Sequence, residues 1–562
     1  MATIAGITGK QFVKGTQAWD NNKYQYASST HGIDHDMNPA LVIQPKNKED
    51  IKLTLQYAKA QGIAVAIRTG GHQYSGASST GGQNIQLDLG QTFRSPDDMV
   101  LLPPKEPDDG KRFVFASVSH ALLEFNTFLG RHKLFVPTGQ CAHVHLGGHV
   151  QTGGYGQLGR SFGLFGDHIR TIYMINADGI ELEVTKESDP DLFFGVLGGS
   201  PGNMGVITHV LIEPHRDEDY TGSLGLKAIH LYDRHTVKRL LGHLAEMSDN
   251  VDFPRNYDLC ISVLSSSFPL RGLWPGLDEN IKTEHPDIFG TNQMPGWPRS
   301  IIVYAQWVPF SKDDKPDMAW FDLFRKGALH IFGDDDVERK PMSRLTPMWL
   351  FTNVREYALP YVKRTYLTNS TTLVQDGWPE WVTGRINELV EPIDNKCWLS
   401  CQIQAFGGRN SMFARNADNG TSYSWRDSTV CATIDAFHWS EAKETAEEWQ
   451  KVNDQVGVGP GGIFSKQDRR VLWGSYGEYD LDSVWQTYYD NREKYEKLMA
   501  IRKKADPYGT FTANPFAVKR AEEVSKMEKK DEETHETNGK VAILVEEHGT
   551  NGTNGKDATD LA

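Results

Sequence analysis

The chain reads R-T-G-G-H-Q-Y-S-G-A-S from Arg68 to Ser78 and C-A-H-V-H-L-G-G-H-V-Q-T-G-G-Y-G from Cys141 to Gly156. Each stretch places one nucleophilic side chain, His72 or Cys141, inside a glycine-rich loop. Because glycine carries no side chain, the main chain of such a loop can come close to a flat or phosphorylated ligand. The two stretches therefore indicate a ligand-binding site built on loops.

The composition is that of a large folded protein. Its length of 562 residues predicts two substantial domains. Its content of 39% hydrophobic and 23% charged residues is ordinary for a globular protein. The formal net charge of -14 supplies no basic face for phosphate, so we expect no nucleic-acid partner. The start lacks a basic segment followed by an apolar one, and no apolar run is long enough to span a membrane. We therefore expect no membrane role and a cytoplasmic location.

Strand and helix patterns alternate in the first third of the chain. Leu41 to Gln44 is a short apolar strand, and Asn47 is typical of an N-cap that opens a helix through about Gln61. Ile63 to Ile67 is a second buried strand, which completes a βαβ unit and delivers Arg68 at a strand's carboxyl end, where open α/β sheets place ligands. Further strands are expected at Ile85–Leu89, Phe113–Val118, Tyr173–Asn176 and Glu181–Thr185, with a helix at Ala121–Gly130.

The middle of the chain predicts a different architecture. Between about 217 and 470 it is rich in Trp, Pro and aromatic residues, and segments with a helical sequence pattern separate some of the strands. These strands are expected at Leu259–Leu264, Ser300–Trp307, Leu399–Ala405 and Val430–Phe437. We predict an antiparallel sheet with helices on one face, which makes the fold class α+β. After about residue 520 the chain is too polar to bury a core, and we predict that it is disordered.

The two opening stretches resemble the flavin loops of the berberine bridge enzyme-like branch of the vanillyl-alcohol-oxidase flavoproteins. In that family the histidine after the Gly-Gly pair bonds the 8α carbon of FAD, and the cysteine of G-x-C-x-x-V-x-x-G-G bonds C6. The resemblance implies FAD held by two covalent bonds, at His72 and Cys141. It also implies a PCMH-type FAD-binding domain of two α/β subdomains, followed by an α+β substrate domain with an antiparallel sheet covered by helices.

Three motifs carry the family's flavin contacts onto this chain. They are the loop after Arg68, the glycine series after Cys141, and D-L-F-F-G-V-L-G-G-S-P-G-N-M-G-V from Asp191 to Val206. The resemblance implies as FAD-binding residues Arg68, Gly70, Gly71, His72, Gly76, Ser78, Cys141, Val144, Gly147, Gly148, His149, Gly153, Gly154, Tyr155, Gly156, Asn203, Gly205, Val206 and, near the isoalloxazine, Asn491.

The resemblance also sets expected domain boundaries. We expect an N-terminal segment at 1–34 that packs on the FAD domain, the FAD-binding domain at 35–216, and the substrate-binding domain at 217–470. A berberine-bridge-like segment at 471–518 returns to the FAD domain, and 519–562 is the disordered tail.

A metal site is the rival interpretation of the second stretch. Cys141, His143 and His145 alternate and would share one face of a strand, with His149 close by, and such ligands suit zinc. Spacing alone does not reject a metal, and it does not reject a buried, unreactive Cys141. The glycine series downstream is required by the flavin loop and not by a zinc ribbon, so we expect no metal.

The implied chemistry is oxidation of a small molecule. Flavin accepts hydride from a substrate C–H bond, so the protein must also supply a base for the released proton. The resemblance places this base at Tyr476, with Glu478 and Tyr479 as alternatives; from the residues alone, Tyr476 is equally a core tyrosine with its hydroxyl bonded. A phenol at its ordinary pKa near 10 is a poor base, so a donor or cation must lie beside it.

The leading hypothesis is an FAD-dependent oxidase of specialised metabolism. Its substrate is a bulky alcohol, sugar or natural-product intermediate, its acceptor is O2, and it acts as a monomer or homodimer. In the resembled family a valine three residues after the bridging cysteine leaves room for O2 at the flavin, and here that residue is Val144. The alternatives are a flavin-bearing redox-neutral cyclase or isomerase and, more distantly, a metal-binding protein that uses Cys141, His143 and His145.

Overall fold

The structure is a computed structural model that describes residues 2–23, 25, 36–73, 76–104, 109–265, 299–328, 330–331, 337–350, 360–391, 396–457, 459–472, 481–512 and 518–519. Residues 1–518 form one compact unit, and of a second unit, residues 519–562, only Lys519 is described. Within the first unit we call residues 2–216 the N-terminal part and residues 217–472 the large-sheet part.

The N-terminal part opens with a four-stranded sheet in the order β1-β2-β4-β3. Strands β2 (Leu41–Gln44) and β3 (Val65–Arg68) both pair in parallel with β4 (Ile85–Asp88), whereas β1 (Lys10–Val13) is antiparallel. Helix α3 (Lys48–Gln61) begins where the Asn47 side chain accepts from the Asp50 N–H. The predicted βαβ unit is therefore present, with β4 lying between its two strands.

A second, antiparallel sheet completes the N-terminal part. Its order is β5-β6-β10-β8-β9, and the strands are β5 (Met99–Leu101), β6 (Val114–Ser117), β10 (Val206–Ile212), β8 (Ile169–Ile175) and β9 (Glu181–Thr185). Its helices are α4 (Leu122–Arg131), α5 (Leu146–Gln151) and α6 (Pro190–Val196). A short pair, β7 (Leu134–Phe135) with β11 (His215–Arg216), ends this part.

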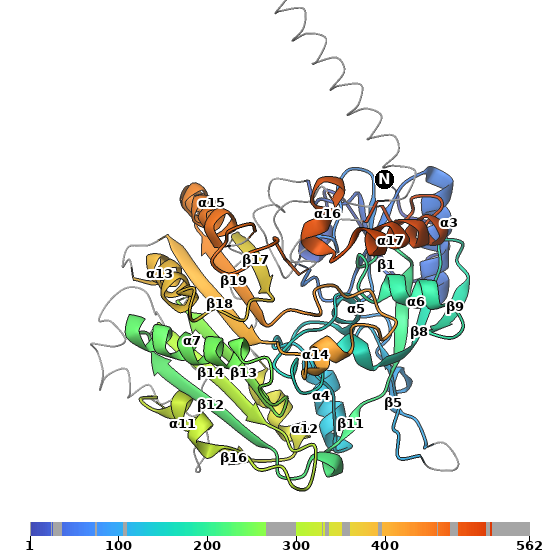
Figure 1. The fold of residues 1–562 in the computed structure, drawn as a ribbon. Coiled ribbons are helices and arrows are strands. Elements are labelled where there is room, and N and C mark those ends of the chain that lie inside the picture. The colour runs from blue at the N-terminus through green and yellow to red at the C-terminus, as the bar shows by residue number, and fades with distance from the viewer. Residues whose placement is uncertain are drawn as a thin grey trace, which may run out of the picture. The chain divides into compact units, whose positions relative to one another are not determined.

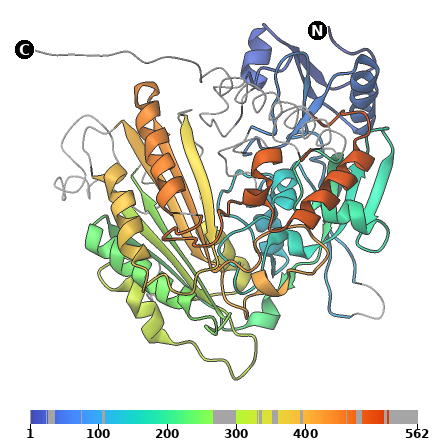
Figure 2. The same ribbon diagram turned by 45° about the horizontal axis from the view of Figure 1, so that its top comes forward.

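The large-sheet part is built on an eight-stranded antiparallel sheet in the order β15-β12-β14-β13-β18-β19-β17, with β16 beside β12. The strands are β12 (Leu224–Leu231), β13 (Tyr257–Leu264), β14 (Ser300–Trp307), β15 (His330–Ile331), β16 (Glu338–Arg339), β17 (Tyr361–Thr368), β18 (Cys397–Ala405) and β19 (Val430–His438). Four helices cover its outer face, as Figures 1 and 2 show: α7 (Arg234–Asp249), α11 (Met318–Arg325), α13 (Trp378–Val390) and α15 (Lys443–Val452). The predicted α+β class, with an antiparallel sheet covered by helices, is confirmed.

The C-terminal helices α16 (Leu481–Tyr488) and α17 (Arg492–Ala505) lie beside the N-terminal part (Figure 1). Beyond α17 several hydrogen bonds hold the main chain there, among them one from the Val518 N–H to the Ser200 hydroxyl at 3.0 Å. The Val65 N–H donates to the Thr510 carbonyl at 2.7 Å, and the Asn203 amide donates to the Phe511 carbonyl at 2.5 Å. The end of this unit therefore packs against the part of the chain that carries the glycine-rich loops.

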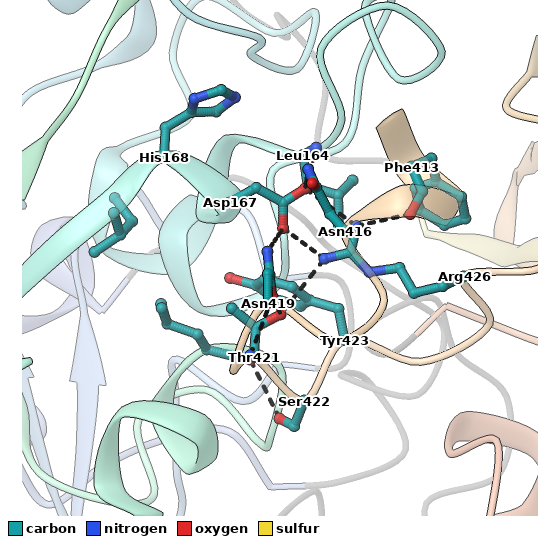
Figure 3. A network of polar contacts seen from close by, with 12 residues as sticks. Leu164, Asp167, His168, Phe413, Asn416, Asn419, Thr421, Ser422, Tyr423 and Arg426 are labelled. Atoms are coloured by element: carbon teal, nitrogen blue, oxygen red, sulfur yellow. Dashed lines mark hydrogen bonds and ion pairs between the residues drawn. The ribbon is translucent and has the colours of Figure 1, made fainter. Parts of the chain in front are cut away.

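A buried ion pair joins the large-sheet part to the N-terminal part (Figure 3). Asp167 follows the second glycine stretch, and Arg426 lies in the loop between β18 and β19; their nearest oxygen and nitrogen are 2.5 Å apart, and their side chains are 2% and 4% exposed. Asn416 and Asn419, from the same loop, donate to the Asp167 carboxylate at 2.9 and 2.7 Å. The Arg426 guanidinium holds the pKa of Asp167 below its ordinary value against the opposing effect of burial.

Arg160 forms a second buried connection between the two parts. Its guanidinium donates to the carbonyls of Phe253, Tyr257 and Gly407 at 2.9, 2.5 and 3.1 Å, and its side chain is 1% exposed. Its main-chain N–H donates to the Asp258 carboxylate at 2.9 Å. The guanidinium also donates to the Pro254 carbonyl at 3.0 Å, so one arginine of the N-terminal part fixes four main-chain positions of the large-sheet part.

Replacing Arg426 tests how much this junction stabilises the fold. Arg426→Met leaves the Asp167 carboxylate buried without its cation, so the free energy of unfolding should fall by about 3–5 kcal/mol. Arg409→Met is the matched control, because Arg409 pairs with Asp252 at the surface, and its loss should cost about 1 kcal/mol or less. Urea denaturation of both variants measures the difference, and equal losses would contradict a special role for the buried pair.

Candidate functional site

A deep cleft lies between the glycine-rich loops and the inner face of the large sheet. It encloses about 1450 Å³, its open mouth included. One wall is made by the loop after β3, the loop between β7 and α5, and the turn before β10. The other wall is made by side chains of β17, β18 and β19. The cleft therefore exists only where the two parts meet.

The two nucleophilic side chains singled out in the sequence converge on this cleft. The Cys141 Sγ lies 3.7 Å from the His72 Nε2, although the residues are 69 positions apart. The His72 Nδ1 lies 3.0 Å from the Gly70 carbonyl, which can only accept, so Nδ1 carries the proton. The Nε2 lone pair then faces the thiol and is placed to accept its proton, which is how an imidazole activates a cysteine.

Cys141 also differs from the other cysteines in exposure. All five cysteines are free thiols, and Cys141 is half-buried whereas the other four are buried. Burial raises the pKa of Cys260 to about 12 and that of Cys397 to about 11, which keeps these thiols protonated and unreactive. Chemistry at a thiolate is therefore directed to Cys141.

His149 is a neutral residue that shapes the loop. Its Nε2 accepts from the Gly139 N–H at 3.1 Å, and burial lowers the pKa of His149 to about 3. Burial, together with the charge of Arg94, lowers the pKa of His145 to about 4. A Cβ at Gly154 would come within 2.8 Å of the His149 ring, and its φ of +66° is in the left-handed region. Glycine is thus required where the loop passes His149.

The structure brings most of the predicted FAD-binding residues to the cleft wall. These are Gly70, Gly71, His72, Ser78, Cys141, Val144, Gly147, Gly148, His149, Gly154, Tyr155 and Gly205. The cleft lining does not include Arg68, Gly76, Gly153, Gly156, Asn203, Val206 and Asn491. Of these, Arg68 donates to the Asn22 carbonyl, and Asn491 is an exposed N-cap of α17. The predicted base positions Tyr476, Glu478 and Tyr479 lie outside the described residues.

The opposite wall was missed in the sequence. Lys363, Gln402, Gln404 and Thr433 line the cleft from the large sheet. The Lys363 ammonium pairs with the Asp435 carboxylate at 3.0 Å, and the side chains are 4% and 7% exposed. Lys363 stands opposite Asp435 in the register of β17 and β19. Gln402 and Gln404 lie two residues apart in β18, which indicates that both side chains lie on the same face of the sheet. The sequence of one strand does not indicate which strand pairs with it, so the position of Lys363 and Thr433 beside them could not be predicted.

The described residues give the metal interpretation no support. Within them, no group of three or more His, Cys, Asp or Glu side chains is arranged to hold a metal ion, and this covers Cys141, His143, His145 and His149.

Among the described residues no helix has the length and apolar character needed to cross a bilayer.

Comparison with known proteins links this chain to FAD-binding and FAD-linked proteins. Residues 39–185 match the FAD binding domain family. An FAD-linked oxidoreductase of Dictyostelium discoideum is 25% identical over 277 residues, which is 49% of this chain and 56% of that protein. Berberine bridge enzyme-like 12 of Arabidopsis thaliana is 29% identical over 30% of this chain and 31% of its own length. This chain thus spans about half the length of the first relative and a third of the second.

A solved structure shares the whole fold. Glucooligosaccharide oxidase from Acremonium strictum, a protein described as carrying a 6-S-cysteinyl, 8α-N1-histidyl FAD, superposes with a TM-score of 0.66. The match covers 91% of this chain and 97% of that one at 16% identity. The likeness shows that this chain shares the fold of that protein.

The neutral histidines predict loss of stability in acid. An imidazole with a folded-state pKa of about 3, below its ordinary 6.5, binds no proton in the folded protein, whereas the unfolded chain binds one. The free energy of unfolding should therefore fall as pH decreases from 6.5 towards 3. In His149→Gln the amide oxygen can accept from Gly139 without titrating, so the fall should become shallower. Urea unfolding across this pH range measures the slope; the exposed His235→Gln is the control, and an unchanged slope in His149→Gln would contradict the assignment.

Proposed function

From the premise that this chain is a berberine bridge enzyme-like relative with an FAD-binding domain at residues 39–185, we propose that it is an FAD-dependent oxidase. Its substrate is a bulky small molecule: an alcohol, a sugar or a natural-product intermediate. Its FAD is bonded to both His72 and Cys141. The observation that carries the proposal is the convergence of these two side chains, 3.7 Å apart, on one wall of the cleft.

The cleft suits a flat, phosphorylated group. At Gly148 a Cβ would meet nothing within 4 Å, so the main chain there borders open space, whereas at Gly202, at φ +75°, it would meet the Ile67 Cβ at 3.8 Å. At Gly70 a Cβ would come within 2.9 Å of His145, so this glycine lets the loop fold tightly beneath His72. The open space at Gly148 lets a ligand approach the main chain, and close approach of the main chain is how glycine-rich loops hold phosphates.

His72 and Cys141 would hold the ring end of FAD, and the loops around Ser78 and Gly148 would hold its remainder. The double linkage named for the Acremonium strictum protein supports the assignment of both tethers. FAD bound here would accept a hydride from a substrate C–H bond and pass the electrons to O2, which gives H2O2.

The large sheet supplies the wall that a substrate would contact. Gln402, Gln404 and Thr433 present amides and a hydroxyl to the cleft, and Lys363 adds a cation held in place by Asp435. Such groups hydrogen-bond hydroxyl or carbonyl oxygens and so orient the carbon that loses hydride. The base that takes up the hydroxyl proton remains a proposal at Tyr476, with Glu478 and Tyr479 as alternatives.

The tethers can be tested without a substrate. Acid-precipitated wild-type protein should keep all its yellow flavin in the pellet, because unfolding does not break a covalent bond. His72→Ala should release part of the flavin, and His72→Ala/Cys141→Ala should release all of it. Cys260→Ala, which removes a buried thiol, is the control and should retain the flavin. Flavin found in the wild-type supernatant would overturn the tether assignment.

Val144 tests the oxidase assignment. Its half-buried side chain lines the cleft three residues after Cys141. One added methylene in a close-packed wall removes the space that O2 needs, so Val144→Leu should slow reoxidation by O2 about tenfold or more and leave substrate reduction nearly intact. Stopped-flow reoxidation measures this, with Val100→Leu in the remote strand β5 as control. Product formation by the wild type without O2 consumption would favour the redox-neutral cyclase or isomerase.

A further inference from the structure

A second pocket lies at the junction, apart from the flavin cleft. It encloses about 780 Å³, its open mouth included, and shares no lining residue with the cleft. Phe162, His168 and His215 form one side, and Tyr220, Arg255 and Phe310 form the other. His168 points away from the neighbouring Asp167–Arg426 pair (Figure 3). The pocket is therefore a separate feature of the same junction.

Its walls are aromatic and closely spaced. The Phe162 ring lies 4.6 Å from the His215 ring, 5.1 Å from the Tyr220 ring and 5.7 Å from the Phe310 ring, measured between centroids. The Tyr220 hydroxyl lies 3.2 Å from the His215 Nδ1, which fixes both rings. A wall of fixed rings offers flat apolar faces on which another ring can stack.

Arg255 supplies the charge. Its guanidinium carbon lies 3.7 Å above the Phe310 ring, and one guanidinium nitrogen donates to the Ser161 carbonyl at 3.4 Å. Among the described residues no carboxylate lies within ion-pair distance of Arg255. Arginine has five N–H donors in a planar fork, so most of its donor capacity is unused.

The two carboxylates that line the pocket are each paired with another arginine. The Glu213 carboxylate pairs with Arg170 at 2.6 Å, and the Asp167 carboxylate pairs with Arg426. Burial lowers the pKa of His215 well below its ordinary value, and His168, Arg170 and Arg255 lower it further. Burial penalises a charge of either sign, so the attraction for an anion comes from the guanidinium of Arg255 itself.

We propose that this pocket binds a planar organic anion, an aromatic carboxylate, with its ring against the half-buried Tyr220 and Phe310 and its carboxylate on Arg255. The guanidinium fork matches the two oxygens of a carboxylate, and the aromatic faces match the ring. The site is independent of the flavin cleft, and the inference does not depend on the proposed oxidase activity.

Benzoate is the probe that tests the site, with the full-length protein studied by titration calorimetry. Benzoate should bind, while benzyl alcohol, which lacks the charge, and acetate, which lacks the ring, should each bind at least about tenfold more weakly. Arg255→Met should weaken benzoate binding by the same factor, and Arg255→Lys should recover only part of it because lysine lacks the planar fork. Phe310→Leu should also weaken binding.

Two controls separate this pocket from other sites. Arg409→Met removes a surface arginine outside the pocket, and Gln402→Leu alters the wall of the flavin cleft; both should keep benzoate affinity within about twofold. A thermal melt of each variant shows that it is folded. Benzyl alcohol binding as tightly as benzoate, wild-type affinity in Arg255→Met, or a loss that follows Gln402→Leu would each overturn the proposal.

Discussion

The buried contact between Asp167 and Arg426 is the constraint on which the rest of the arrangement depends. A carboxylate and a guanidinium removed from water are tolerable only if their remaining lone pairs and protons are also satisfied. Asn416, Asn419 and the Leu164 N–H satisfy the carboxylate here, and all of these groups must arrive together. The loop between β18 and β19 is therefore held in one position against the end of the second glycine stretch. Arg160 adds main-chain contacts at neighbouring positions, so the large sheet is fixed at several points.

The two walls of the cleft depend on different parts of the structure. His72 and Cys141 are brought together by the N-terminal part alone, because both follow strands of this part through loops in which glycine removes the obstacle of a side chain. The polar wall of Lys363, Gln402, Gln404 and Thr433 comes from the other part and stands opposite them only because the junction holds it there. The pairing of His72 with Cys141 and the position of the polar sheet face are therefore set separately, the first by loop geometry and the second by sheet placement.

The same junction creates the second pocket. Phe162 and His168 approach it from one part, and Tyr220, Arg255 and Phe310 approach it from the other. The lining also includes Asp167 and Asn416, so the pocket lies against the ion-pair network itself. A ligand held there would contact both sides of the junction that positions the wall formed by Lys363, Gln402, Gln404 and Thr433. The pocket and the cleft are thus both lined by residues of the N-terminal part and of the large-sheet part.

The sequence alone determined much of the local structure. The Asn47 cap and the strands at Leu41–Gln44, Glu181–Thr185 and Ser300–Trp307 depend on neighbours in the chain, and they were predicted correctly. Strands β12 and β17 were missed; β17 places Lys363 and Arg364 in its interior, and their charge hides a strand whose cations are each paired with a carboxylate of another segment. The roles of Asp167, Arg426 and Lys363 depend on partners tens to hundreds of residues away, and a charged residue in a sequence shows its charge but not the group that will neutralise it. Only the tertiary structure decided those pairings, because the desolvation that makes them necessary arises when the two parts come together.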